Sequence, residues 1–220
     1  MPILAWAIVR ITPDSVGFDS SRNRTPKAML PGQQAPKGQT MSKRAILVVD
    51  LQSEYWPRGN FSLVGIEAAA ANAARVIRHG RENGDLVVNI RHEMPGGPIF
   101  VPGSDGAQIN EAVLPQADEP VITKNFANSF RETGLDALLT QQGVEEVVVV
   151  GAMSHMCVDA TTRAANDLGY RTVTVHDACA TRDLEFNGVT TPAAQVHAAF
   201  MAGLAFLYGE VVGTDELLAR

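Results

Sequence analysis

An alternation of short apolar runs with longer helical periods is the feature that most limits the folds open to this chain. The apolar runs, each of strand length, are Ala45–Leu51, Asp85–His92, Pro120–Lys124, Glu146–Ala152, Arg171–Ala178 and Glu210–Gly213. Stretches with helical periodicity separate them: Ile66–His79, Gly134–Gln142, His155–Leu168, Pro192–Tyr208 and Asp215–Leu218. Strands that are apolar on both faces and joined by helices form parallel sheets covered on both sides. The pattern predicts an α/β fold, a three-layer, doubly wound, mainly parallel six-stranded sheet of Rossmann-like type with helices on both faces.

The first 40 residues differ from the rest of the chain. They are rich in Pro, Gly, Ser, Gln and Thr and have no sustained period, and Met41 then opens the run "MSKRAILVVD". We expect residues 1–40 to be a disordered or non-native extension and residues 41–220 to form one domain.

A second irregular stretch, Glu93–Glu119, holds four prolines and four glycines. It is either a lid or binding loop or a surface excursion, and the sequence leaves both open.

Composition argues against several classes of partner. The formal net charge is −6, from 18 basic and 24 acidic residues without a basic cluster, so neither nucleic acid nor an anionic membrane surface is expected as a partner. No apolar stretch reaches the roughly 18 residues that cross a bilayer. The two cysteines lack the spacing of a disulfide framework, which favours a reducing, cytoplasmic compartment. A small-molecule substrate is the partner we expect.

Three reactive side chains follow ends of the predicted strands. Asp50 follows the first strand, Lys124 ends the third, and Cys157 comes shortly after the fourth. Each alone has a structural interpretation: a turn cap, a solvated charge and a small buried hydrophobe. Because ligands of open α/β sheets bind beyond the carboxyl ends of the strands, the three together favour a catalytic site at one edge.

The local sequence favours Cys157 as a nucleophile. Ser154 is a candidate N-cap, which places Cys157 near the third helical position, where free N–H groups and the helix dipole stabilise a thiolate. A carboxylate at Asp50 could take the thiol proton, and the Lys124 ammonium would offset the buried negative charge.

Histidine remains an alternative base. His155 would point to another side of the helix than Cys157, whereas His176 ends a neighbouring strand and stays open as a proton acceptor. Cys179 follows an apolar strand without an acid or base partner, so we expect it to be unreactive. The sequence has no phosphate-binding glycine loop and no metal-ligand spacing such as HExxH, and we therefore predict no cofactor and no metal.

The segments "AILVVDLQSEYW", "VITKNFANSF" and "GAMSHMCVDATTRAANDLGYRTVTVHDACAT" resemble the isochorismatase-like cysteine hydrolases. The resemblance implies that Asp50, Lys124 and Cys157 form a catalytic triad. It also implies a cis peptide bond between Ala152 and Met153. The N–H groups of Met153 and Cys157 would then form an oxyanion hole, and the family resemblance further implies dimers or higher oligomers.

Two branches of that family can be compared with this chain. Nicotinamidases carry an Asp-x-His metal pattern after the second strand, where this chain reads "VVNIRHEMPGG", and true isochorismatases generally lack the cysteine. We therefore expect a hydrolase that cleaves a small amide-like C–N bond through an acyl-enzyme on Cys157. The alternatives are vinyl-ether hydrolysis by Asp50 and Lys124, and a non-catalytic ligand-binding or thiol-sensing protein.

The sequence also suggests a substrate pocket and a surface for self-association. Residues that follow strand ends at the catalytic edge could line a small apolar pocket: Tyr55, Trp56, Phe61, His92, Phe126 and Phe130. The C-terminal run "AAQVHAAFMAGLAFLYGEVVG" is apolar nearly all round, so it needs cover on more than one face. A second subunit would provide that cover, and we expect a homodimer or higher homo-oligomer.

Overall fold

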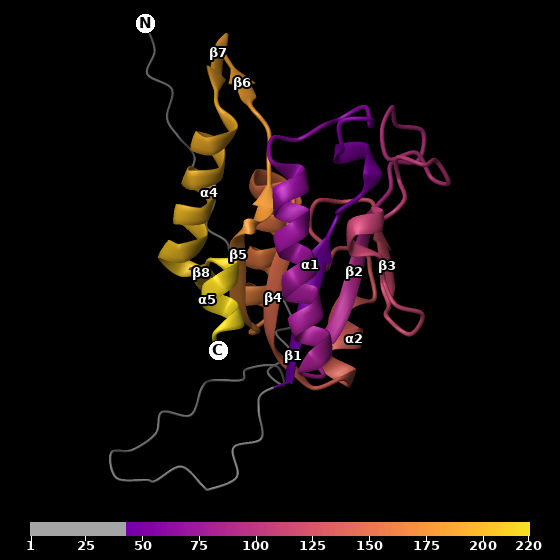
Figure 1. The fold of residues 1–220 in the computed structure, drawn as a ribbon, viewed down its shortest axis with the longest axis vertical. Coiled ribbons are helices and arrows are strands. Elements are labelled where there is room, and N and C mark those ends of the chain that lie inside the picture. Colours follow the sequence, from indigo (N-terminus) through magenta and orange to yellow (C-terminus); the bar gives the residue numbers. More distant parts are fainter. Residues whose placement is uncertain (1–42) are drawn as a thin grey trace, which may run out of the picture. The chain divides into compact units, whose positions relative to one another are not determined.

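A computed structural model of the chain describes residues 43–220, and the predicted extension over residues 1–40 lies outside them. Six of its strands form one sheet in the order β3-β2-β1-β4-β5-β8, and every neighbouring pair is parallel (Figure 1). These strands are β1 (Lys43–Val49), β2 (Leu86–His92), β3 (Val121–Lys124), β4 (Val144–Ala152), β5 (Arg171–Ala180) and β8 (Glu210–Val212). The predicted doubly wound sheet is confirmed.

Helices cover both faces of the sheet. They are α1 (Ile66–Glu82), α2 (Leu135–Gln141), α3 (Asp159–Asp167), α4 (Ala193–Leu207) and α5 (Thr214–Leu218). Alternate residues of β1 divide between the two layers: Ile46 and Val48 pack with apolar residues of α1 and α5, while Leu47 and Val49 pack with those of α2, α3 and α4. The three layers follow from this alternation, since each strand of the central sheet must bury both of its faces.

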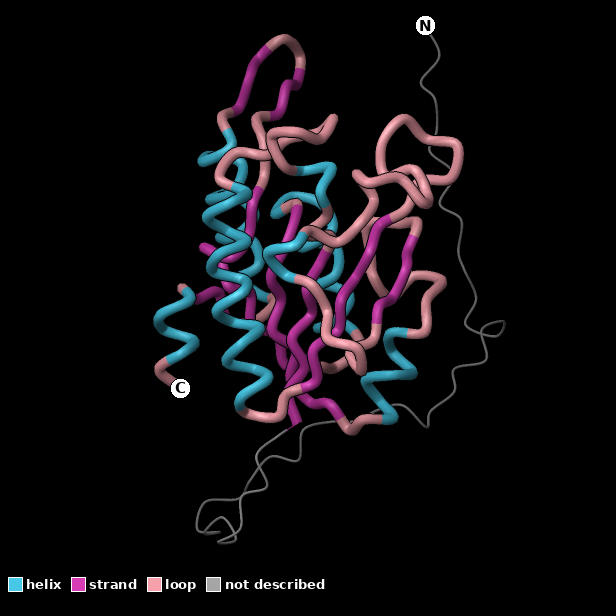
Figure 2. Tube along the Cα trace, turned by 45° about the vertical axis from the view of Figure 1, so that its right-hand side comes forward, coloured by secondary structure: helices cyan, strands magenta, loops and turns pink. Residues whose placement is uncertain are grey.

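Beyond the main sheet, a short hairpin that the apolar pattern did not predict projects from the end of β5 (Figure 2). Its strands are β6 (Leu184–Phe186) and β7 (Val189–Thr191), which pair antiparallel. Asn187 and Gly188 join them with φ of 51° and 74°, the left-handed conformation that tight hairpin turns require. The Asn-Gly pair was the sequence signal for this turn.

The loops that follow β1, β2, β4 and β5 gather at one end of the sheet (Figure 2). The loop after β1 is joined to the long insertion after β2 by a bridge between Gln52 and Ile109. Gly151, near the end of β4, has φ of 135°, and a Cβ there would collide with the Val49 carbonyl. This glycine lets β4 lie against the last residue of β1, beside Asp50. None of the helices within residues 43–220 is long and apolar enough to cross a membrane.

Candidate active site

Three side chains from separate segments meet at the carboxyl end of the sheet. Asp50 follows β1, Lys124 is the last residue of β3, and Cys157 lies in a turn after β4. Lys124 Nζ is 2.7 Å from Asp50 Oδ2 and 3.2 Å from Cys157 Sγ. Asp50 is fully buried, Lys124 is 1% exposed and Cys157 is 6% exposed, so the three interact with almost no solvent between them. The topology thus brings together the three residues that the sequence placed at one edge.

The ammonium of Lys124 stays charged in this buried position. Burial lowers the pKa of Lys124, but the charge of Asp50 and the interactions of the ammonium with Asp50 and Cys157 have the opposite effect, and the pKa is raised overall. A buried lysine without such partners would shift the other way and lose its proton. The Asp50–Lys124 ion pair therefore persists at neutral pH.

Cys157 is a neutral thiol in the resting site. Burial raises the pKa of Cys157, the charge of Asp50 raises it further, and the Lys124 ammonium only partly offsets both. The raised pKa opposes the thiolate that was expected from the helix dipole, and its causes are burial first and the Asp50 carboxylate second. The proton must leave with the help of a base, and Asp50 Oδ1 is buried without a hydrogen-bond partner among the described residues.

The turn that carries Cys157 also differs from the expected helix start. Ser154–Val158 form a π-helical turn that precedes α3, and Cys157 is its fourth residue. Ser154 does not cap the helix: its hydroxyl donates to the Ala180 carbonyl at 3.3 Å and lies 2.8 Å from His197 Nδ1. These contacts join the turn to β5 and α4.

A cis peptide bond links Ala152 to Met153 at the entrance to this turn. The Met153 N–H has no carbonyl partner among the turn and loop hydrogen bonds of residues 43–220. In the turn that follows, the N–H groups of Met156 and Val158 donate to the Met153 carbonyl, whereas the Cys157 N–H has no partner among the same hydrogen bonds. The N–H groups of Met153 and Cys157 are therefore candidates to bind an oxyanion.

A fourth side chain, which the sequence assigned only to the pocket wall, contacts the lysine. His92 ends β2, and its Nδ1 lies 3.2 Å from Lys124 Nζ. Burial and the Lys124 ammonium lower the pKa of His92, and Asp50 raises it by less. The imidazole is therefore neutral at neutral pH.

The remaining predicted pocket residues fall into two groups. Tyr55 is buried, and its pKa is raised by burial and by the charges of Asp50 and Cys157, which places the phenol beside the triad. Trp56 and Phe61 are half-buried against the same packing cluster as Tyr55. Phe100, which the sequence analysis did not select, makes edge contacts with Tyr55 and His92 at ring-centroid distances of 5.0 and 5.5 Å.

The last two aromatic residues have neighbours of their own. The Arg131 guanidinium lies 3.7 Å from the ring centroid of Phe126. Phe130 stacks on Tyr170 at 6.2 Å, within the cluster that packs under α2, α3 and α4. The structure thus gives Phe130 a packing contact on the opposite layer from Tyr55.

The other histidines are engaged elsewhere. His155 Nδ1 is 2.6 Å from the Thr181 hydroxyl, and its pKa is lowered by burial and by Arg182. His176 faces the ring of His197 at 6.3 Å. Among the hydrogen bonds of residues 43–220, neither histidine contacts the thiol of Cys157, so Asp50 is the base that the geometry offers.

One group of side chains has the composition of a metal site. A carboxylate oxygen of Asp50, a ring nitrogen of His92 and Cys157 Sγ lie within 4.8 Å of one another. The Lys124 ammonium contacts all three residues. It therefore supplies, between them, the positive charge that a metal ion would bring.

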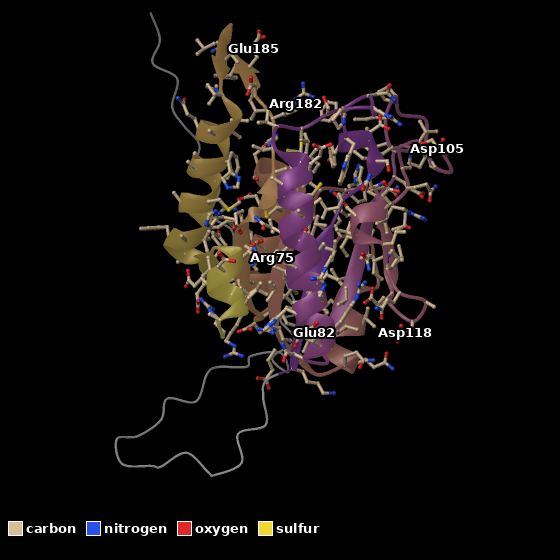
Figure 3. All side chains as sticks on the ribbon, viewed as in Figure 1. Arg75, Glu82, Asp105, Asp118, Arg182 and Glu185 are labelled. Carbon is tan, nitrogen blue, oxygen red and sulfur yellow. The ribbon has the colours of Figure 1, made fainter. Side chains whose placement is uncertain are left out.

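Charged residues lie at both ends of the sheet. Arg182, Glu185 and Asp105 lie at the end that holds the site, and Glu82 and Asp118 lie at the far end (Figure 3). The Arg182 guanidinium lies 4.2 Å from the ring centroid of Phe61. A cation thus stands over one of the predicted pocket aromatics.

Comparisons with known proteins agree with this geometry. A family model for the isochorismatase domain matches residues 44–215. An uncharacterized isochorismatase family protein of Bacillus subtilis (strain 168) is 43% identical over 176 residues, covering 79% of this chain and 98% of its own. The maleamate amidohydrolase of Pseudomonas putida is 33% identical over 194 residues, covering 81% of this chain and 86% of its own.

A solved structure extends the agreement to the fold. An isochorismatase-family structure from Oleispira antarctica superimposes with a TM-score of 0.79 at 50% identity, covering 82% of this chain and 98% of that one. The residues matched by the family model, 44–215, include Asp50, Lys124 and Cys157. The chain belongs to the isochorismatase-like hydrolase family.

Proposed function

We propose that this hydrolase cleaves a small amide, or a related ureido C–N bond, through an acyl-enzyme on Cys157, which is a thioester for an amide and a thiocarbamate for a ureido substrate. The observation that supports this most directly is the double contact of one buried ammonium, 2.7 Å from the Asp50 carboxylate and 3.2 Å from the Cys157 sulfur. It joins a base, a cation and a nucleophile in one dry site, the arrangement that activates a weak nucleophile.

The first step forms the C–S bond. Asp50 takes the proton from Cys157, and Sγ attacks the carbonyl carbon of the substrate. The Lys124 ammonium stabilises the sulfur as it loses its proton. The N–H groups of Met153 and Cys157 bind the oxyanion, and donors aimed at developing charge of this kind typically contribute about 10²- to 10³-fold in rate each.

The second step breaks the C–N bond. The protonated carboxyl of Asp50 gives its proton to the leaving nitrogen, ammonia or an amine departs, and a thioester to Cys157 remains. Asp50 then takes a proton from water, which attacks the thioester carbon. The thiolate leaves, regains its proton from Asp50, and a carboxylic acid is released.

The substrate class rests on two supports. A cysteine nucleophile suits attack on a carbonyl carbon, and the relative from Pseudomonas putida is an amidohydrolase by name. Tyr55 interacts with Asp50 and Cys157 and packs in one cluster with the half-buried Trp56 and Phe61, which favours a small, partly apolar substrate.

A panel of small primary amides and ureido acids, scored by ammonia release, tests the proposal. We expect turnover of at least one member, an acyl adduct on Cys157 by intact mass, and loss of turnover in Cys157→Ala but not in Cys179→Ala. Vinyl-ether turnover that survives Cys157→Ala would instead support isochorismatase-type chemistry. No turnover across the panel, together with reversible oxidation of Cys157, would support a thiol-sensing role.

A further inference from the structure

The ammonium of Lys124 has three N–H groups, and the site offers it three acceptors. Asp50 Oδ2 lies at 2.7 Å, and Cys157 Sγ and His92 Nδ1 both lie at 3.2 Å. A lysine ammonium donates and never accepts hydrogen bonds, so His92 Nδ1 must present a lone pair and the ring proton must sit on Nε2. The contact thus defines both the charge and the tautomer of His92.

The backbone of His92 is held by a second buried side chain. Gln52 is fully buried, its Oε1 accepts from the His92 N–H at 2.8 Å, and its Nε2 donates to the His92 carbonyl at 2.8 Å. The same Nε2 donates to the Ala107 carbonyl at 2.7 Å. β2 runs beyond the last β1 pair, Val49 with Ile90, and the Gln52 amide takes the place of a backbone partner there. His92 is therefore fixed as firmly as a residue inside the sheet.

The ring of His92 is also restrained. Phe100 meets it edge-on at a centroid distance of 5.5 Å. The charged or titratable groups that face it are Lys124 from β3, Asp50 from the end of β1 and Cys157 from the π-helical turn. Since Lys124 is a permanent cation next to Nδ1, the site accepts the neutral ring and opposes an imidazolium.

We propose that His92 is a positioning residue for Lys124, whose third N–H it accepts so that the other two are aimed at Asp50 and Cys157. The proposal rests on the proposed function, because it assigns a role within the same triad. An ammonium with a free third donor can rotate about its Cε–Nζ bond. With all three N–H groups bonded, its contact with the sulfur is kept while the thiol proton moves to Asp50.

The proposal separates His92 from the pocket wall. A residue that only contacts substrate changes KM, whereas one that orients Lys124 changes kcat. A hydrogen bond to a charged group is strong enough that its loss lowers a rate by roughly ten- to a hundredfold. Protonation of His92 removes the lone pair, so kcat should also fall at acid pH; because the pKa of His92 is lowered, the fall should come at a pH below the ordinary histidine pKa of about 6.5.

A matched pair of variants tests the role. In His92→Leu the acceptor is lost, and we expect kcat to fall roughly ten- to a hundredfold with little change in KM. In His92→Asn the side-chain oxygen, bonded to Cγ as Nδ1 is, can accept the same N–H. We expect His92→Asn to recover most of kcat and to retain it at lower pH than the natural protein. A raised KM with unchanged kcat in His92→Leu would overturn the proposal.

Nitrogen-15 NMR of the His92 ring gives a readout that needs no substrate. We expect the Nε2–H tautomer at neutral pH, with an unprotonated Nδ1, and a rise in the pKa of His92 in Lys124→Met because the neighbouring cation is gone. An imidazolium or an Nδ1–H tautomer at neutral pH would contradict the proposal. Because this spectrum is independent of turnover, a failed amide panel with the expected tautomer would count against the proposed reaction and not against the His92–Lys124 contact.

Discussion

The two cysteines lie near the same end of the sheet and are buried to a similar degree, but their surroundings differ. Cys157 is 6% exposed and Cys179 is 7% exposed. Cys179 lies in β5 opposite Gly151, and burial raises its pKa to about 12. Cys157 has a similarly raised pKa, but a carboxylate and an ammonium lie beside it. Burial makes both thiols neutral, and only the neighbours of Cys157 can remove its proton and stabilise the resulting charge.

This difference means that thiolate content at rest is a poor guide to which cysteine is the nucleophile. Burial raises the pKa of Cys179, the backbone of Gly151 lowers it and the charge of Asp177 raises it, and no ammonium is among these causes. Cys157 gains a general base, whose help typically amounts to 10²- to 10⁴-fold in rate. The helix dipole contributes about 0.3 to 1 kcal/mol, up to about 2 in partly buried sites, and is the smaller effect.

The largest effect is expected from removing the base. Asp50→Asn keeps the size and hydrogen bonding of the side chain but cannot take the thiol proton, so Cys157 would become as inert as Cys179. We expect kcat to fall at least about a hundredfold while the fold is retained. Steady-state kinetics with circular dichroism as the folding control measure this. Near-normal turnover would move the proton acceptor to the substrate or to another group.

The second effect comes from removing the cation. Lys124→Met leaves Asp50 and Cys157 without the charge between them, so the pKa of Cys157 should rise further and kcat should fall. The pH at which Cys157 is alkylated should move upwards, because the ammonium lowers the thiol pKa in the natural protein. The losses of Asp50→Asn and Lys124→Met should not add in the double variant, since residues of one catalytic unit share a step. Additive losses would indicate separate roles.

The sequence predicted that Asp50, Lys124 and Cys157 meet at one edge of the sheet, and this prediction rested on topology. Asp50, Lys124 and Cys157 follow strands that all run the same way, and parallel strands end at one edge whatever the details of packing. The apolar periods were long enough to identify those strands. Their boundaries were less certain: β1 ends at Val49, and Asp50 already has a left-handed φ of 51°.

The contact between His92 and Lys124 could not be predicted from the sequence. It depends on the register that places His92 opposite Lys124 and on the Gln52 amide that holds the His92 backbone. No local pattern connects residues so far apart along the chain. The neutral state of Cys157 was missed for a related reason. The pKa of this thiol depends on burial and on the charges of Asp50 and Lys124, and the sequence does not show how deeply the site is buried.

The third effect compares the cysteines directly. Alkylation at neutral pH should label Cys157 ahead of Cys179, because Asp50 and Lys124 assist the loss of its proton. A charge-assisted hydrogen bond corresponds to roughly ten- to a hundredfold, so we expect a rate ratio of at least about ten. Peptide mapping after timed iodoacetamide treatment measures the ratio. It should fall towards one in Lys124→Met, and faster labelling of Cys179 in the natural protein would contradict the comparison.

The smallest effect is expected from a change on α4, the helix that contacts the turn carrying Cys157. Ser154 in that turn contacts His197 of α4, whereas Cys179 is held by the sheet. The outward face of α4 is apolar at its C-terminal end, where Phe206 is 87% exposed and Leu207 is 68% exposed. We propose that a second copy of the chain covers this face, which would steady the turn that carries Cys157.

Burial of one phenylalanine or leucine side chain contributes roughly 1.5 to 3 kcal/mol, so Phe206 and Leu207 on each copy would add to the stability of an interface on this face. Phe206→Glu places a charge on that face, and we expect it to dissociate the oligomer. Light scattering should show the natural protein at a multiple of the 23.5 kDa chain mass and the variant at the chain mass. Because Asp50, Lys124 and Cys157 stay in place, kcat should fall less than about tenfold, far less than the loss expected for Asp50→Asn. A natural protein that is monomeric in dilute solution would remove the second copy from this account and leave the exposed face of α4 without an occupant.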